Sequence, residues 1–221
     1  MAEFGRTTRR PLYWAVGCGF LVLMTALSGC WRPAGIGVGG NYNDALLELG
    51  KTQQGGDVRK AIVHLQYVVR RNPKYKDSLT QLGRAYYYAG RYDQSFEVLK
   101  RALALNREDE IGWIVLGLTQ MRRGDDEAGL ASLKGGLTLL AKATRDGYKD
   151  FNEEFWDSRG VVRRALRQSI TLTRRGVDDK QRILVAGEVL LHRIDRELYD
   201  AEQYQSHSEY LDSRRDRKKD N

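Results

Sequence analysis

A spacing of 34 residues recurs through the middle of the chain. From Tyr42 onward the only proline is Pro73, and apolar residues recur at helical spacing rather than alternating as they would in a strand. A repeated unit of this length without a strand pattern predicts stacked helix pairs, so we expect an all-α fold. The pairs that carry the spacing are Leu79 and Trp113, Leu82-Gly83 and Leu116-Gly117, Gly90 and Gly124, and Leu99 and Leu133.

The repeated unit resembles the tetratricopeptide repeat, whose pattern is W-x2-L-G-x2-Y, then small, large and small residues, then a closing proline. The resemblance implies a short solenoid of about three helix-turn-helix repeats over residues 42–144. The middle unit matches at Leu79, Leu82, Gly83, Tyr86, Gly90, Ser95, Leu99 and Ala102. The third unit matches at Trp113, Leu116, Gly117, Gly124, Gly129, Leu133 and Gly136. A divergent first unit keeps Ala45, Gly56, Ala61, Leu65, Val68 and Pro73.

The remaining segments surround these repeats. Residues 30–41 contain several glycines and little bulk, which predicts a flexible linker. Residues 145–211 predict additional helices that cap the end of the solenoid, because a solenoid end needs a polar outer face. Asp157 and Ser158 can begin the first of these helices. Five of the six residues from 214 to 219 are basic, so residues 212–221 predict a disordered basic tail, or alternatively a tether to an anionic surface.

The first 29 residues have the order of a secretory signal peptide. A basic stretch is followed by an apolar run and by small residues, and the apolar run is short for a membrane-spanning helix. Leu27-Ser28-Gly29-Cys30 resembles the lipobox of bacterial lipoproteins, which implies cleavage before Cys30 and acylation of that cysteine. An uncleaved N-terminal anchor is the alternative. The sequence leaves open whether export uses the general or the twin-arginine route.

Charge and cysteine content restrict the partners. The formal net charge is +8, and loss of the signal peptide, with three arginines and one glutamate, lowers it to +6. A basic chain often binds nucleic acid, but an exported one does not meet it, so we expect no nucleic-acid partner. Of the two cysteines, Cys18 is lost with the signal peptide and Cys30 is acylated, so no disulfide is expected.

No motif for catalysis, a metal or a cofactor stands out. The three histidines, His64, His192 and His207, are far apart and lie outside any recognisable metal-binding spacing. No nucleophile-elbow sequence marks a catalytic serine. We therefore expect no metal, no cofactor and no enzymatic activity.

The resemblance implies a concave groove lined by the first helix of each repeat, where a peptide could bind. Residues 111–118 are apolar nearly all round, so something must cover them. Either the C-terminal helices fold into the concave side or a partner occupies it. The groove residues implied by the repeat register are Thr80, Arg84, Tyr87, Tyr88, Ile114, Leu118, Met121 and Arg122.

These features together predict a lipid-anchored scaffold that binds a protein partner in the cell envelope, as an assembly or secretion accessory. Among similar lipoproteins, aspartate after the acylated cysteine retains the protein at the inner membrane. Here that residue is Trp31, so the resemblance implies the periplasmic side of the outer membrane, with the outer face of the cytoplasmic membrane as the alternative. The alternative function is binding of an anionic envelope polymer (polysaccharide, peptidoglycan or lipid) by the basic surface. The oligomeric state is left open.

Overall fold

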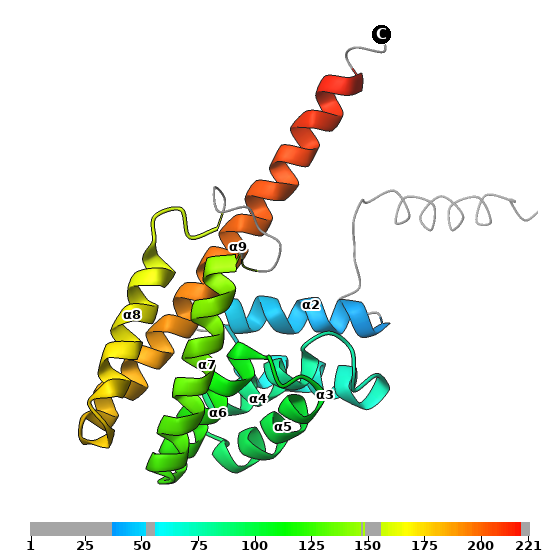
Figure 1. The fold of residues 1–221 in the computed structure, drawn as a ribbon. Coiled ribbons are helices and arrows are strands. Elements are labelled where there is room, and N and C mark those ends of the chain that lie inside the picture. The colour runs from blue at the N-terminus through cyan, green and yellow to red at the C-terminus, as the bar shows by residue number, and fades with distance from the viewer. Residues whose placement is uncertain (1–36, 52–55, 147, 149–155, 218–221) are drawn as a thin grey trace, which may run out of the picture. The chain divides into compact units, whose positions relative to one another are not determined.

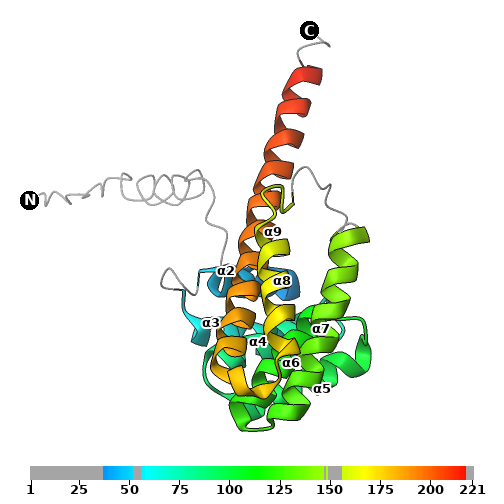
Figure 2. The same ribbon diagram turned by 60° about the vertical axis from the view of Figure 1, so that its left-hand side comes forward.

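The computed structural model describes residues 37–51, 56–146, 148 and 156–217. Within these residues the secondary structure is helical and contains no strand, which confirms the all-α prediction (Figures 1 and 2). The helices are α2 (Gly37–Gly50), α3 (Val58–Arg71), α4 (Ser78–Tyr88), α5 (Tyr92–Leu105), α6 (Glu110–Arg123), α7 (Asp126–Asp146), α8 (Val161–Arg174) and α9 (Lys180–Arg217), with a 3-10 turn, η2 (Val177–Asp179), before α9.

The first six of these helices form three successive antiparallel pairs. Helix α2 packs on α3, α4 on α5 and α6 on α7. The second helix of each pair also packs on the first helix of the next pair, so the pairs stack in sequence order. This is a tetratricopeptide-like helical repeat fold, in which each unit buries its apolar face against its neighbour.

Two glycines permit the close approach of the helices within a pair. A Cβ added at Gly83 would lie 2.5 Å from Cγ of Leu99, and one added at Gly117 would lie 2.6 Å from the backbone nitrogen of Leu133. Both leucines are fully buried and lie 16 residues after the glycine they meet. The second and third repeats therefore use the same contact, as their 34-residue spacing predicts.

Helix starts and turns follow the sequence signals. Asp57 begins α3 by accepting hydrogen bonds from the backbone N–H groups of Arg59 and Lys60. Desolvation alone would raise the pKa of Asp57, but these two bonds and the positive charges of Arg59 and Lys60 together lower it. After α6 the chain turns at Gly124, whose φ of 96° is a left-handed conformation that glycine adopts without strain.

Helices α8 and α9 form an antiparallel hairpin after the repeats (Figure 1). Helix α8 begins at Val161, later than the predicted start at Asp157 and Ser158, but the carboxylate of Asp157 still accepts hydrogen bonds from the backbone N–H groups of Val162 (2.8 Å) and Arg163 (3.0 Å) in its first turn. Helix α8 also packs on α7, and α9 contacts α6 and α2. Residues 35–221 form one compact unit, which contains all the buried apolar side chains of the described core.

Two predicted boundaries are wrong. The linker was expected to extend to residue 41, but α2 begins at Gly37, and Asn41 and Tyr42 are already buried in it. Tyr42 stacks edge-to-face on Tyr75 and anchors this end of the helix, which outweighs the low helix propensity of the glycines. The tail was expected to begin at residue 212, but α9 continues to Arg217. No glycine or proline follows Gly187, so no residue there interrupts the helix.

Candidate protein-interaction groove

The predicted groove residues lie on two neighbouring first helices. Thr80, Arg84, Tyr87 and Tyr88 belong to α4, and Ile114, Leu118, Met121 and Arg122 belong to α6. The structure brings the two sets together, because α4 and α6 contact each other. Only Arg122 at the rim is well exposed. Tyr88 is half-buried, and the other six are buried.

Helix α9 covers these residues. A Cβ added at Gly187 would lie 2.7 Å from Cδ2 of Leu118, so α9 approaches α6 closely at this glycine. Leu184, Leu191 and Ile194 of α9 are buried in the same core cluster as Leu118. Of the two alternatives for the apolar helix at residues 111–118, the structure therefore shows the first, in which a C-terminal helix fills the concave side.

A buried ion pair connects α9 to α4. Arg84 donates to the carboxylate of Asp195, and its side chain is 6% exposed. A second hydrogen bond of 3.3 Å goes to the hydroxyl of Tyr88. Burial alone would lower the pKa of Arg84, but the charge of Asp195 more than offsets it, so this pKa is raised and the guanidinium remains charged. A predicted groove residue thus serves an intramolecular contact.

A second polar contact closes the rim of the groove. The hydroxyl of Tyr87 donates to Glu188 of α9, and Arg122 donates to the same carboxylate oxygen at 2.9 Å. Burial raises the pKa of Tyr87, so its hydroxyl stays protonated and can donate. Both α4 and α6 are therefore tied to one glutamate on α9.

Thr80 connects two repeats. Its hydroxyl donates to one carboxylate oxygen of Asp109. The second oxygen of Asp109 accepts from the backbone N–H of Gly112 at 2.8 Å and so caps the start of α6. Burial raises the pKa of Asp109, against the lowering effect of these two hydrogen bonds. Thr80 therefore positions the third repeat on the second.

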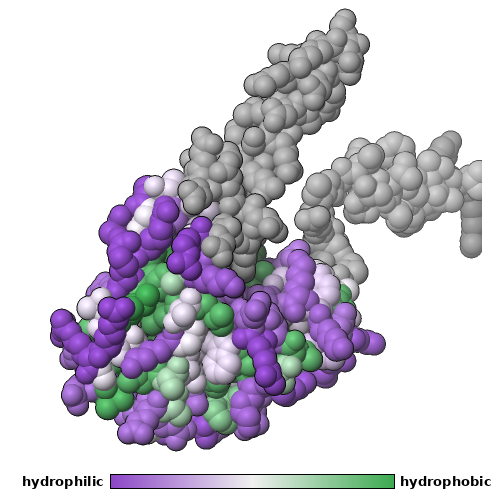
Figure 3. Space-filling model, in the orientation of Figure 1, coloured by the Kyte–Doolittle hydropathy of each residue, from purple (hydrophilic) through white to green (hydrophobic). Residues whose placement is uncertain are grey.

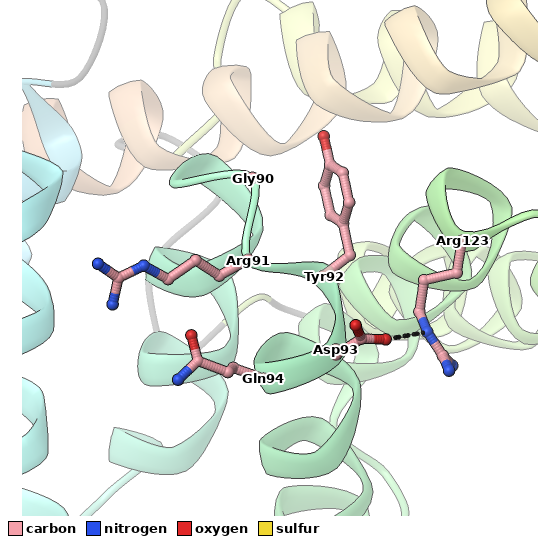
Figure 4. Close-up of a pocket in the computed structure, with 6 residues that line it drawn as sticks. All are labelled: Gly90, Arg91, Tyr92, Asp93, Gln94 and Arg123. Atoms are coloured by element: carbon pink, nitrogen blue, oxygen red, sulfur yellow. Dashed lines mark hydrogen bonds and ion pairs between the residues drawn. The ribbon is translucent and has the colours of Figure 1, made fainter.

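One shallow depression remains open near the groove, at the turn between α4 and α5 (Figure 4). It measures about 490 Å³, and its lining includes Tyr92, Asp93 and Arg123. Asp93 accepts from Arg123 at 2.9 Å, and the Tyr92 ring points toward the pale orange ribbon of α9. Polar, solvent-facing groups and a preformed ion pair give this depression little apolar surface for a ligand.

A second depression lies between α8 and α9 and was missed at the sequence level. It measures about 590 Å³ and is lined by Arg159, Val161, Arg164, His192, Arg193, Arg196 and Glu197. The available signal was the composition of α8, which contains four arginines and no acidic residue. In Figure 3, hydrophilic side chains predominate at the outer edge of the molecule on the side where Figure 1 draws α8, with apolar ones between them.

The lipobox residues Leu27, Ser28, Gly29 and Cys30 lie outside the described residues. In the part of the chain that the structure describes, no helix combines the length and the apolar character needed to cross a bilayer. Over the same residues, histidine, cysteine, aspartate and glutamate do not gather into a group that could hold a metal ion.

The tetratricopeptide repeat model matches residues 53–118. This range runs from just before α3 into α6 and contains the whole second repeat. The match supports a tetratricopeptide-repeat protein and, since such repeats usually mediate protein–protein interaction, a scaffold with a protein partner. A comparison with curated proteins gave no match.

Proposed function

We propose that this protein is a lipid-anchored scaffold of the bacterial cell envelope that holds another protein near a membrane and has no catalytic activity. The observation that carries the proposal is the tetratricopeptide repeat over residues 53–118, because an elongated stack of helix pairs offers a large surface for a protein partner. An accessory role in assembly or secretion agrees with such a surface.

The anchor is supported by the sequence of residues 27–30. Each methylene of an acyl chain that enters a bilayer contributes about 0.8 kcal/mol, so two or more chains on Cys30 would hold the protein stably. With Trp31 after the cysteine, we assign the protein to the periplasmic side of the outer membrane, and the outer face of the cytoplasmic membrane is the alternative. Cys30→Ser tests the anchor: after cell fractionation the variant should leave the membrane fraction, and if it stays there, the uncleaved anchor is correct.

The filled groove determines where the partner can bind. Ile114, Leu118 and Met121 have no exposed surface, so a partner that entered the groove would first have to remove α9. We therefore assign the partner to the outer face of the repeats. The second helices α3 and α5 expose Val63 (63%) and Leu105 (55%) there.

Site-specific photo-crosslinking in the intact envelope tests this assignment. A photoreactive residue at Val63 or Leu105 should capture one discrete protein. The matched control is Val185, an exposed aliphatic residue on α9 (47%). Capture at Val185 alone would place the partner on the C-terminal hairpin and contradict the assignment to the repeats.

A further inference from the structure

The basic depression between α8 and α9 combines side chains from three places in the sequence. Arg159 comes from the turn before α8, Arg164 from the first turn of α8, and Arg193 and Arg196 from the middle of α9. The antiparallel hairpin brings them to one surface. Four arginines and one histidine then face a single acidic side chain, Glu197.

That glutamate cannot neutralise the whole group. Glu197 is buried, and one of its oxygens accepts from the backbone N–H of Asp157 at 3.3 Å. Its nearest guanidinium is that of Arg159, at 3.8 Å. Arg196 has a partner outside the depression, Asp200, at 3.3 Å on the exposed side of α9. Among the residues that the structure describes, the depression therefore has an excess of positive charge.

Arg164 and Arg193 differ from the other two arginines of the depression. Among the described residues, neither Arg164 nor Arg193 forms an ion pair. Arg164 is held in place by a hydrogen bond of 2.7 Å from its guanidinium to the backbone carbonyl of Arg159, which leaves its positive charge uncompensated. Like charges gathered in one depression repel each other, and an anion bound between them removes that repulsion.

We propose that this depression binds a phosphate group. A guanidinium presents parallel N–H donors that match the oxygens of a phosphate or a carboxylate. A carboxylate has two oxygens in one plane, whereas a phosphate group can accept from several guanidiniums that approach from different directions. Arginines on two helices and a turn are the arrangement that suits phosphate. This inference does not depend on the anchor or on the protein partner.

The test uses residues 35–221, the compact unit that contains the whole described core. Inorganic phosphate is titrated against it by calorimetry at constant ionic strength, with chloride as the reference anion. Saturable binding at one site is expected. Arg164→Ala together with Arg193→Ala should weaken it by about tenfold or more, because two charge-assisted hydrogen-bond donors are lost.

The matched control is Arg70→Ala together with Arg101→Ala, which removes the same charge from exposed positions on α3 and α5. This control should bind phosphate as the unmodified unit does. A second variant pair, Arg164→Lys with Arg193→Lys, keeps the charge without the paired donors and should restore part of the binding. Circular dichroism shows whether each variant is folded.

Vesicles identify the source of the phosphate group. A lipid headgroup is the source if the protein sediments with phosphatidylglycerol vesicles but not with phosphatidylcholine vesicles. This sedimentation should be lost when Arg164→Ala and Arg193→Ala are combined. Binding of inorganic phosphate without vesicle binding assigns a free phosphate. The proposal is overturned if neither probe binds, if the control variant loses as much binding, or if only a carboxylate polymer such as polygalacturonate binds.

Discussion

Replacing Asp195 by alanine tests whether α9 is held in the concave groove. Among the described residues Asp195 is the only carboxylate that pairs with Arg84, whose side chain is 6% exposed. Breaking a buried ion pair by removing one partner costs roughly 3–5 kcal/mol, because the other charge stays buried. Since 20% of the Asp195 side chain is exposed, water can reach part of the vacated space, and we expect a loss of about 3 kcal/mol in the free energy of unfolding.

Urea unfolding of residues 35–221, followed by circular dichroism, measures this loss. The matched control is Asp200→Ala on the same helix, where the partner Arg196 is exposed. That exposed pair should contribute less than about 0.5 kcal/mol. Replacing both buried partners, as Arg84→Met with Asp195→Leu, should recover most of the stability, because apolar side chains of similar volume need no desolvation of charge. Equal stability of Asp195→Ala and Asp200→Ala would refute the buried contact.

Three further predictions follow from the packing and the pKa values. Gly117→Ala should lower the free energy of unfolding by roughly 1–3 kcal/mol, because the new Cβ meets the backbone of α7. Gly135→Ala, which has open space around it, should raise the free energy of unfolding by up to about 1 kcal/mol, and thermal unfolding compares the two variants. The pKa of Asp109 is raised in the folded chain, so stability falls as pH rises from the ordinary aspartate value near 4 through the raised one. The stability of Asp109→Asn should therefore rise relative to that of the unmodified unit over this pH range. Parallel curves of Tm against pH for the two proteins would contradict this. A chain ended at Arg175 lacks α9 and should aggregate in light scattering; a monodisperse fragment of unchanged stability would show that α9 is not part of the core.

The sequence predicts the repeats well because their contacts are local. Gly83 and Leu99 belong to one helix pair, and so do Gly117 and Leu133, so a fixed spacing records each contact directly. The same holds for Asp157, whose capping role depends on residues that follow it closely.

The occupant of the groove could not be derived in this way. Arg84 and Asp195 are 111 residues apart, and Tyr87 and Glu188 are 101 apart, so no periodic pattern connects them. The apolar helix at residues 111–118 indicated that something covers it but not what. Gly187 is the residue that permits the cover, because its missing side chain lets α9 reach Leu118. A charged substitution at Leu118 would therefore disturb the core rather than report on a partner.

The position of α9 also separates the basic residues into two groups with different roles. Arg84 and Arg122 face α9 and are neutralised by Asp195 and Glu188, so they hold the hairpin on the repeats. In the depression between α8 and α9, Arg164 and Arg193 form no ion pair with any carboxylate of the described residues, although their neighbours Arg159 and Arg196 do. Net charge alone cannot distinguish these groups, because it counts a paired arginine and an unpaired one equally. Replacing Arg193 by alanine should therefore weaken the binding of phosphate, whereas replacing Arg122 by alanine should not, although both arginines are exposed.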